Sequence, residues 1–281
     1  MKIGISSFAF TSPFCDAEIG LIKKIADMGF DVFEMAMEDP ELIHPEIIKA
    51  SLEENHIGIT TCAVIGEGRD LSSDSSQIRA STKMYLRECI LLASKVGSNV
   101  VAGALYSTVG KRRFISPQEK KAEWKRSVES LKEVSAYAGD HGVKLAIEPL
   151  NRFENDMINT SAQGVEMIED VGSPYLGLLL DTFHMNIEEK NTKGAILIGG
   201  KHVFHMHVCE NDRGIPGTGQ VDWKGTAKAL KEIDYQGACV IEAFTPALTS
   251  LAAAVCLWRP LAPSQEVLGR DGLAFLRNLL N

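Results

Sequence analysis

The feature of this chain that most constrains its fold is a regular alternation of short apolar runs with longer amphipathic segments. The short runs have the length of β-strands, and some, such as residues 177–180, are apolar throughout. Strands covered on both faces of a parallel sheet have this composition. The sequence predicts eight strands, at residues 3–8, 32–36, 58–64, 99–105, 144–149, 176–181, 203–208 and 238–243.

The segments between these strands have helical periodicity. In the first of them, isoleucine recurs at Ile19, Ile22 and Ile25, the spacing of a helix that buries one face. The predicted helices are residues 16–28, 45–55, 77–96, 117–141, 162–171, 223–233 and 272–280. A left-handed glycine is expected where a helix ends before a strand. Four glycines follow predicted helices in this way: Gly29, Gly97, Gly142 and Gly237.

Eight strand–helix units in 281 residues favour an α/β fold, a closed (β/α)₈ TIM barrel. The hydrophobic content of 45% can fill one large core, so a single domain is expected over residues 1–281. An open doubly wound sheet is the alternative, but residues 6–9 are not the glycine-rich phosphate turn typical of that fold. Residues 245–267 are the least regular part and are expected to form a long final loop.

Net charge, cysteine content and hydropathy indicate which partners and which cellular location this protein is expected to have. The net charge of −8 argues against non-specific binding to nucleic acid or anionic membrane. Six scattered cysteines without a CxxC pair predict free thiols and a cytoplasmic location. We expect no signal peptide, and no apolar run reaches the roughly 18 residues of a membrane span.

A carboxylate or an imidazole ends each of the last four predicted strands, at Glu148, Asp181, His207 and Glu242. A carboxylate directly after an apolar run is costly to bury unless a cation or ionic partner compensates. In a parallel barrel the carboxyl ends of the strands carry the active site. The four side chains predict a divalent metal site with open positions for a substrate. A purely structural ion-pair network is the alternative.

The donor set also indicates which metal is expected. Three carboxylates and one imidazole suit Mn²⁺ best, with Mg²⁺ or Co²⁺ possible, and suit Zn²⁺ less because thiolates are lacking. His205 and His207 alternate on the seventh strand and should share a face, with His205 one layer deeper. Glu34 ends the second strand and either supports a ligand or forms a structural ion pair. Arg213 either donates to substrate oxygens or forms a surface ion pair.

Two longer motifs resemble the ketose 3-epimerases, which act on D-tagatose, D-psicose (D-allulose) or L-ribulose and belong to the xylose isomerase-like barrels. The motifs are IEPLNRFE at residues 147–154 and LDTFHMNIEE at residues 180–189. Residues 217–219 and 258–259 are also similar to this family. The resemblance covers essentially the whole chain.

The resemblance implies that Glu148, Asp181, His207 and Glu242 bind the metal. It implies that Glu148 and Glu242 exchange the C3 proton of a free ketose through a cis-enediolate. Three more residues match family positions that hold the O1–O3 end of the substrate: Glu154, His184 and Arg213. The family also implies a homodimer or homotetramer.

Four other functions remain open. An aldose–ketose or hydroxypyruvate-type isomerase, or an inosose dehydratase, would use the same metal. Endonuclease IV would require more than seven histidines and a basic surface. A non-catalytic sugar-binding barrel could lose a ligand, whereas all four candidates are present. A free ketose is expected rather than a phosphate ester, and Thr108 and Val109, where some relatives carry a large aromatic residue, leave the preferred ketose open.

Overall fold

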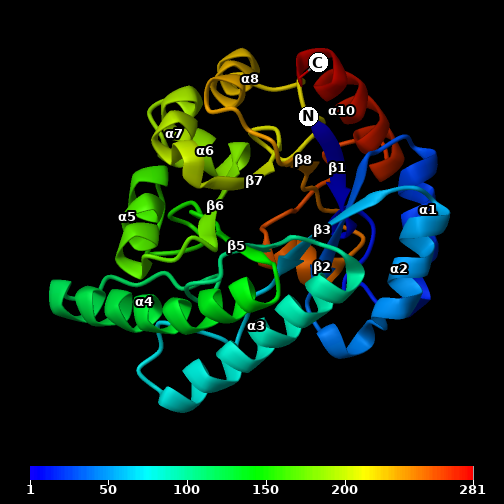
Figure 1. Cartoon of the computed structure of the whole chain (residues 1–281). Coiled ribbons are helices and arrows are strands. Elements are labelled where there is room, and N and C mark those ends of the chain that lie inside the picture. The colour runs from blue at the N-terminus through cyan, green and yellow to red at the C-terminus, as the bar shows by residue number, and fades with distance from the viewer. Residues whose placement is uncertain (281) are drawn as a thin grey trace.

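The computed structural model describes residues 1–280 as a closed barrel of eight parallel strands, in which neighbours along the chain are neighbours in the sheet. Figure 1 shows the barrel enclosed by helices. This confirms the predicted (β/α)₈ architecture, with residue 281 of the predicted domain outside the described part. The strands are β1 Lys2–Ser6, β2 Val32–Met37, β3 Gly58–Ala63, β4 Val100–Gly103, β5 Lys144–Ile147, β6 Leu176–Asp181, β7 Val203–His207 and β8 Ala238–Ile241.

The barrel closes between the first and last strands, where Ile3 pairs with Cys239 and Ile5 with Ile241. Gly4, between them, is required by close packing, because a Cβ atom there would lie 2.8 Å from the Val32 carbonyl oxygen. Every residue of β2 and β6 is buried. This double-sided burial explains why these strands read as apolar runs in the sequence.

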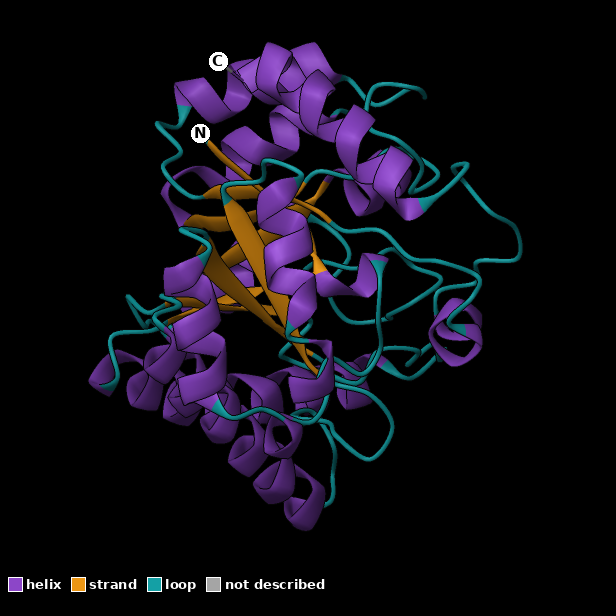
Figure 2. Ribbon diagram, turned by 90° about the vertical axis from the view of Figure 1, so that its right-hand side faces the viewer, coloured by secondary structure: helices purple, strands orange, loops and turns teal. Residues whose placement is uncertain are grey.

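Helices follow the strands and cover the outside of the barrel. Figure 2 shows them around the strands, with long loops extending on one side. Capping boxes begin α4, at Ser116 and Glu119, and α5, at Thr160 and Gln163. The helices are α1 Gly20–Asp27, α2 Pro45–Glu54, α3 Ser76–Val96, α4 Pro117–Asp140, α5 Ser161–Val171, α6 Thr182–Glu188, α7 Thr192–Gly199, α8 Trp223–Glu232, α9 Thr249–Ala254 and α10 Gln265–Leu280.

The prediction of a loop over residues 245–267 was wrong. Helix α9 lies within it, and α10 begins at Gln265 rather than at residue 272. Gly269 lies where α10 packs closely, because a Cβ there would meet the Met28 side chain at 2.6 Å. A residue without a side chain lets the helix lie close to the barrel.

The predicted helix-terminal glycines were right at three positions and wrong at one. Gly29, Gly97 and Gly142 have positive φ angles. After α8 the left-handed residue is Asp234, with φ of 53°, and Gly237 lies beyond it. Asparagine and aspartate can adopt this conformation, so glycine was not needed at the helix end itself.

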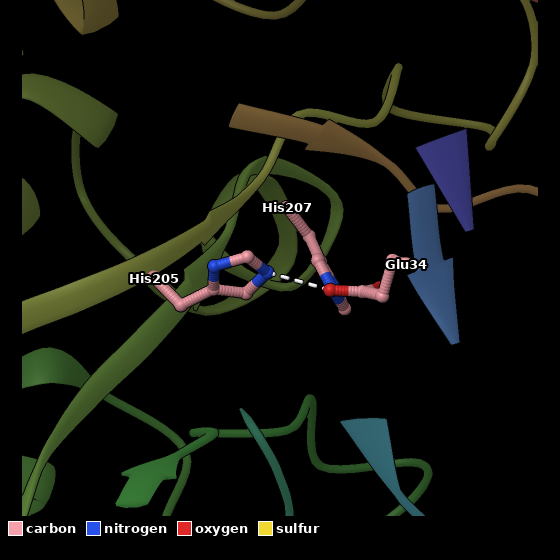
Figure 3. A group of neighbouring side chains, drawn as sticks. All are labelled: Glu34, His205 and His207. Atoms are coloured by element: carbon pink, nitrogen blue, oxygen red, sulfur yellow. Dashed lines mark hydrogen bonds and ion pairs between the residues drawn. The ribbon is translucent and has the colours of Figure 1, made fainter. Parts of the chain in front are cut away.

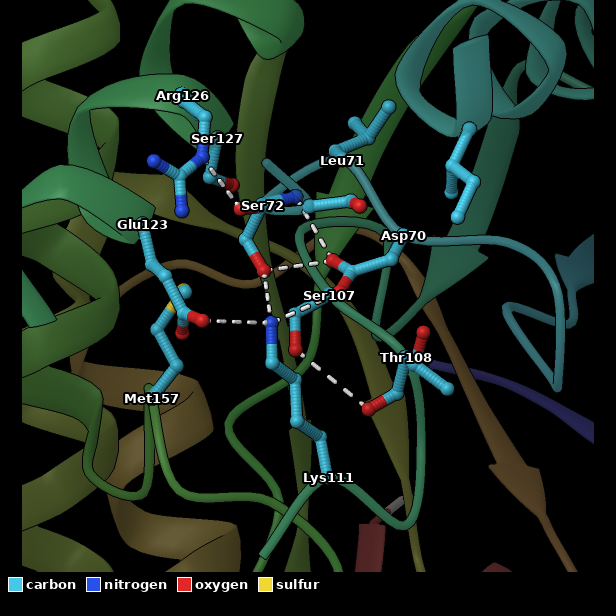
Figure 4. Close-up of polar contacts among 12 residues, drawn as sticks. Asp70, Leu71, Ser72, Ser107, Thr108, Lys111, Glu123, Arg126, Ser127 and Met157 are labelled. Atoms are coloured by element: carbon cyan, nitrogen blue, oxygen red, sulfur yellow. Dashed lines mark hydrogen bonds and ion pairs between the residues drawn. The ribbon is translucent and has the colours of Figure 1, made fainter. Parts of the chain in front are cut away.

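A half-buried lysine ties together the loops that follow β3 and β4. Lys111 Nζ lies 2.8 Å from Asp70 Oδ2, 2.6 Å from Ser72 Oγ and 3.2 Å from Glu123 Oε1 on α4 (Figure 4). Next to Lys111, the Gly110 N–H donates to the Glu154 carbonyl at 2.7 Å. The network therefore also holds the loop after β5, which carries a candidate substrate-binding residue.

The structure also bears on two expectations from the sequence, about membrane-spanning helices and about the cysteines. No helix in residues 1–280 is both long and apolar enough to cross a bilayer. All six cysteines lie in this part of the chain as free thiols, as predicted, four of them buried.

Candidate metal and substrate site

The structure brings the four predicted metal ligands together at the carboxyl end of the barrel. Ligand atoms of Glu148, Asp181 and His207 all lie within 4.8 Å of one another. His207 Nδ1 lies 3.9 Å from Glu148 Oε1 and 3.7 Å from Glu242 Oε1. β5 and β8 end one residue before Glu148 and Glu242, so both carboxylates stand at the strand ends, as predicted. All four side chains are buried.

Three atoms of this cluster have no hydrogen-bond partner in the described chain. They are Glu148 Oε1, Asp181 Oδ2 and His207 Nδ1, and all are inaccessible to solvent. Leaving one such buried atom unpaired costs about 1–3 kcal/mol or more, so three at one point require an explanation. Oxygen and imidazole donors that converge without partners fit a divalent cation.

Asp181 uses its two oxygens differently. Oδ1 accepts a hydrogen bond from the Phe183 N–H at 2.8 Å and so caps α6 at its first residue. This cap orients the carboxylate and leaves Oδ2 directed toward the cluster. A strand that ends in an aspartate followed directly by a helix thus fixes the ligand position locally.

Glu34 on β2 orients the imidazole of His207. Glu34 Oε1 lies 2.9 Å from His207 Nε2, and Oε2 lies 2.7 Å from His205 Nε2 (Figure 3). Both histidines therefore face the same side of β7, as predicted. Because His207 Nε2 donates to a carboxylate, its other nitrogen, Nδ1, is the one presented to the cluster. Of the two roles open for Glu34, the geometry favours support of a candidate ligand.

The charges in this cluster shift the pKa values of its members. Burial pushes the pKa of Glu34 upward, but His207 and His205 outweigh it and hold that pKa far below its ordinary value. Burial lowers the pKa of His207, but Glu34 and Glu242 outweigh it and raise that pKa well above 6.5. Because His207 Nε2 already donates to Glu34, a second ring proton would lie on Nδ1, the atom that a cation would use.

Both candidate acid/base residues have raised pKa values. Burial, followed by repulsion from Glu242, raises the pKa of Glu148 well above 4.5. Burial raises the pKa of Glu242 to about 6, and His207 and Arg213 oppose that rise. Carboxyl groups whose pKa values are raised toward neutrality by burial suit general acid–base catalysis.

Arg213 connects the cluster of candidate metal ligands to the predicted substrate-binding residues. Its Nη2 lies 3.4 Å from Glu242 Oε2 and 3.4 Å from His184 Nε2, and its Nη1 lies 3.8 Å from Glu154 Oε1. The guanidinium is buried and packs on the Phe183 ring at 4.1 Å. The surface ion pair that the sequence left open for Arg213 is thereby excluded.

Two neighbours of the site were not identified from the sequence as site residues. Cys209 is buried, and its Sγ donates to the Glu242 carbonyl oxygen at 3.1 Å. Asn151 contacts both His184 and Glu154. Cys209 follows the predicted strand of His205 and His207 without a pattern of its own, whereas Asn151 lies inside the first epimerase-like motif.

The Glu210 carboxylate, in the loop after β7, stabilises the fold of that loop and is not one of the candidate metal ligands. It accepts hydrogen bonds from the N–H groups of Gly217 and Val221 and from the Trp223 indole. These bonds fold the loop that carries Arg213. Its oxygens are thus occupied, unlike those of the ligand cluster.

The closed barrel with a polar cluster at its carboxyl rim is the architecture of α/β-barrel enzymes. The family model for the xylose isomerase-like TIM barrel matches residues 22–279. A probable ketose 3-epimerase of Synechocystis sp. is 36% identical over 99% of this chain and 96% of the relative. A D-psicose 3-epimerase of Agrobacterium fabrum is 33% identical over 92% of both chains.

A solved structure of a named 3-epimerase has the same fold as this chain. The crystal structure of a D-allulose 3-epimerase from Methylomonas sp. matches with a TM-score of 0.94 and 29% identity, covering 100% of this chain and 98% of that one. This chain therefore belongs to the xylose isomerase-like TIM barrel family and, within it, to the ketose 3-epimerases, which are carbohydrate isomerases.

Proposed function

We propose that this protein is a metal-dependent ketose 3-epimerase that reversibly inverts C3 of a free ketose. The observation that carries the proposal is the convergence of three unpartnered buried ligand atoms, from Glu148, Asp181 and His207, next to Glu242. The similarity to named ketose 3-epimerases over the full chain supports the same reaction. Ketoses of the D-tagatose, D-fructose/D-psicose or L-ribulose type are the proposed substrates.

We assign Glu148, Asp181, His207 and Glu242 as the metal ligands and Mn²⁺ as the preferred cation, with Mg²⁺ or Co²⁺ as substitutes. When bound, a divalent cation supplies Lewis-acid polarisation of substrate oxygens. The mostly carboxylate donor set is the basis of this choice.

Glu148 and Glu242 are the proposed acid/base pair. One carboxylate takes the proton from C3, and the electron pair of that C–H bond moves through C2 onto the carbonyl oxygen, which gives a cis-enediolate. The other carboxyl group returns a proton to C3 from the opposite face. The two groups suit this exchange because both are buried and burial raises the pKa of each, which favours the exchange of a proton near neutral pH.

Glu154, His184 and Arg213 are the proposed contacts to the O1–O3 end of the ketose. Arg213 places a fixed positive charge 3.4 Å from Glu242. A donor already held in position stabilises negative charge that develops on a substrate oxygen without further reorganisation. Burial of the guanidinium excludes water and strengthens this effect.

The proposal is tested by proton exchange in deuterated water. With Mn²⁺ present and D-fructose, D-tagatose or L-ribulose as substrate, we expect deuterium to appear at C3 together with the 3-epimer. Proton NMR of the recovered sugars measures both. Label at C1 alone would contradict the proposal and support an aldose–ketose isomerase, and absence of exchange with every ketose would favour a sugar-binding barrel.

Glu34 is expected to control metal affinity through His207. Glu34→Gln removes the charge and one of the two acceptors, so His207 is less firmly oriented. Loss of such a supporting group typically weakens metal binding by about 10–100-fold, which calorimetric titration with Mn²⁺ would measure. His205→Gln is the matched control, because it leaves the Glu34–His207 contact in place and should weaken binding less. An unchanged Kd in Glu34→Gln would contradict this role.

A further inference from the structure

We propose that Asn151 is a positioning residue that fixes His184 with its proton on Nε2 and holds Glu154 beside it. This inference rests on the proposed function, because His184 and Glu154 are the proposed substrate contacts. Asn151 follows Leu150 in the loop after β5, and its side chain is buried. It acts through these two neighbours and is not assigned a contact with the reacting atoms.

The hydrogen bonds to His184 Nδ1 determine the state of the ring. The backbone N–H of Asn151 points at Nδ1 from 3.1 Å, and the side-chain Nδ2 of the same residue lies 2.9 Å from it. A backbone N–H can only donate, so Nδ1 must accept and cannot carry a proton. The imidazolium form is thereby excluded, and the single ring proton lies on Nε2.

The orientation of the Asn151 amide is fixed independently of His184. Its Oδ1 lies 2.9 Å from the Phe153 N–H, which again can only donate, so this atom must be the oxygen. The amide nitrogen then has two hydrogens and two acceptors, His184 Nδ1 and Glu154 Oε1 at 2.9 Å. Every side-chain group of Asn151 is therefore satisfied, and one residue links the loop after β5 to α6.

With this proton position, the contact between His184 and Arg213 is not a hydrogen bond between the two side chains. With the proton on Nε2, His184 Nε2 and Arg213 Nη2 are two donors that lie 3.4 Å apart. Nε2 is 3.6 Å from Glu148 Oε1 and 3.9 Å from Asp181 Oδ2, too far for a good hydrogen bond. Nε2 has no close acceptor and Nη2 has only Glu242 Oε2 at 3.4 Å, so these two adjacent donors suit a shared oxygen. We place one of the ketose O1–O3 oxygens between them, with His184 as donor and not as base.

The variant Asn151→Asp tests this role, because it keeps the shape of the side chain and replaces the amide donor with a carboxylate oxygen. That oxygen would face the lone pair of His184 Nδ1 and the carboxylate of Glu154. We expect kcat/KM for the ketose to fall by about 10²-fold, mainly through KM, because the C3 carboxylates remain in place. The Kd for Mn²⁺ should be unchanged in calorimetric titration.

Asn159→Ser is the matched control for damage to the loop. Asn159 lies in the same connection, and its side-chain amide donates only to the backbone oxygens of Leu150 and Asn155. This variant should retain the kinetic constants of the wild type. If Asn151→Asp also retained them, or if it lost Mn²⁺ affinity as strongly as kcat/KM, the positioning role would be overturned.

The proton position is tested without any turnover. Nitrogen NMR of the Mg²⁺-loaded protein labelled with ¹⁵N-histidine should show His184 with an unprotonated Nδ1 and a protonated Nε2, with His184→Gln identifying the signals. In Asn151→Asp the Nδ1 signal should move toward the protonated form. A wild-type Nδ1 that carries a proton would overturn the inference. Failure of C3 exchange would instead count against the proposed reaction, so the two failures are distinguishable.

Discussion

Glu148→Gln and Glu242→Gln are each expected to lower epimerisation by about 10²–10⁴-fold, the range that one positioned acid or base supplies. Glutamine keeps the size of each side chain but cannot take up or release the C3 proton. Both positions follow strand ends that are fixed by the barrel, so the fold should be retained. Chromatographic separation of the two ketose epimers at saturating Mn²⁺ measures the loss.

A matched variant separates the loss of chemistry from a general effect of the substitution. Glu88 is exposed on α3, and Glu88→Gln should leave turnover unchanged. The remaining carboxylate in each site variant should still exchange the C3 proton of one epimer, the one whose C–H bond faces it. Near-normal turnover in either site variant would refute the acid/base assignment.

The strands could be predicted because the barrel buries them on both faces. β6 was predicted with its observed bounds, since Asp181 interrupts a run of leucines where the strand ends. The helices α6 and α7 were missed because each is short and lies in a polar or glycine-containing connection. α10 was predicted to begin at residue 272 but begins at Gln265; the close packing of Gly269 against Met28, which accommodates a glycine in this helix, arises only after folding.

The candidate ligands could be predicted for a different reason, which is the cost of a buried carboxylate. Glu148, Asp181 and Glu242 each follow apolar residues, and this local pattern is visible in the sequence. The role of Glu34 could not be predicted from a local pattern, because its partners His205 and His207 lie 171 and 173 residues away. Only the closed barrel places Glu34 of β2 beside His205 and His207 of β7.

Removal of the divalent cation is expected to abolish turnover and to make the contribution of Glu242 to stability fall as pH rises. In the metal-free protein the pKa of Glu242 is raised to about 6 from an ordinary value of 4.5, so between these values the native state binds more protons than the unfolded state. Stability is therefore greatest below pH 4.5 for this group and is lost as pH rises through 6. The raised pKa of His207 acts with the same sign at higher pH.

Bound Mn²⁺ should reverse this loss, because the cation replaces the protons that the cluster otherwise takes up. At a free concentration of 100 times Kd, ligand binding adds about 2.7 kcal/mol to the free energy of unfolding. Thermal unfolding between pH 4.5 and 7, with chelator and with Mn²⁺, measures both effects. Asp181→Asn is the matched control: it removes one carboxylate from the cluster, so the chelated variant should lose less stability with rising pH and gain less from Mn²⁺. A chelated wild type with full turnover, or an equal gain from Mn²⁺ in Asp181→Asn, would contradict a metal held by this cluster.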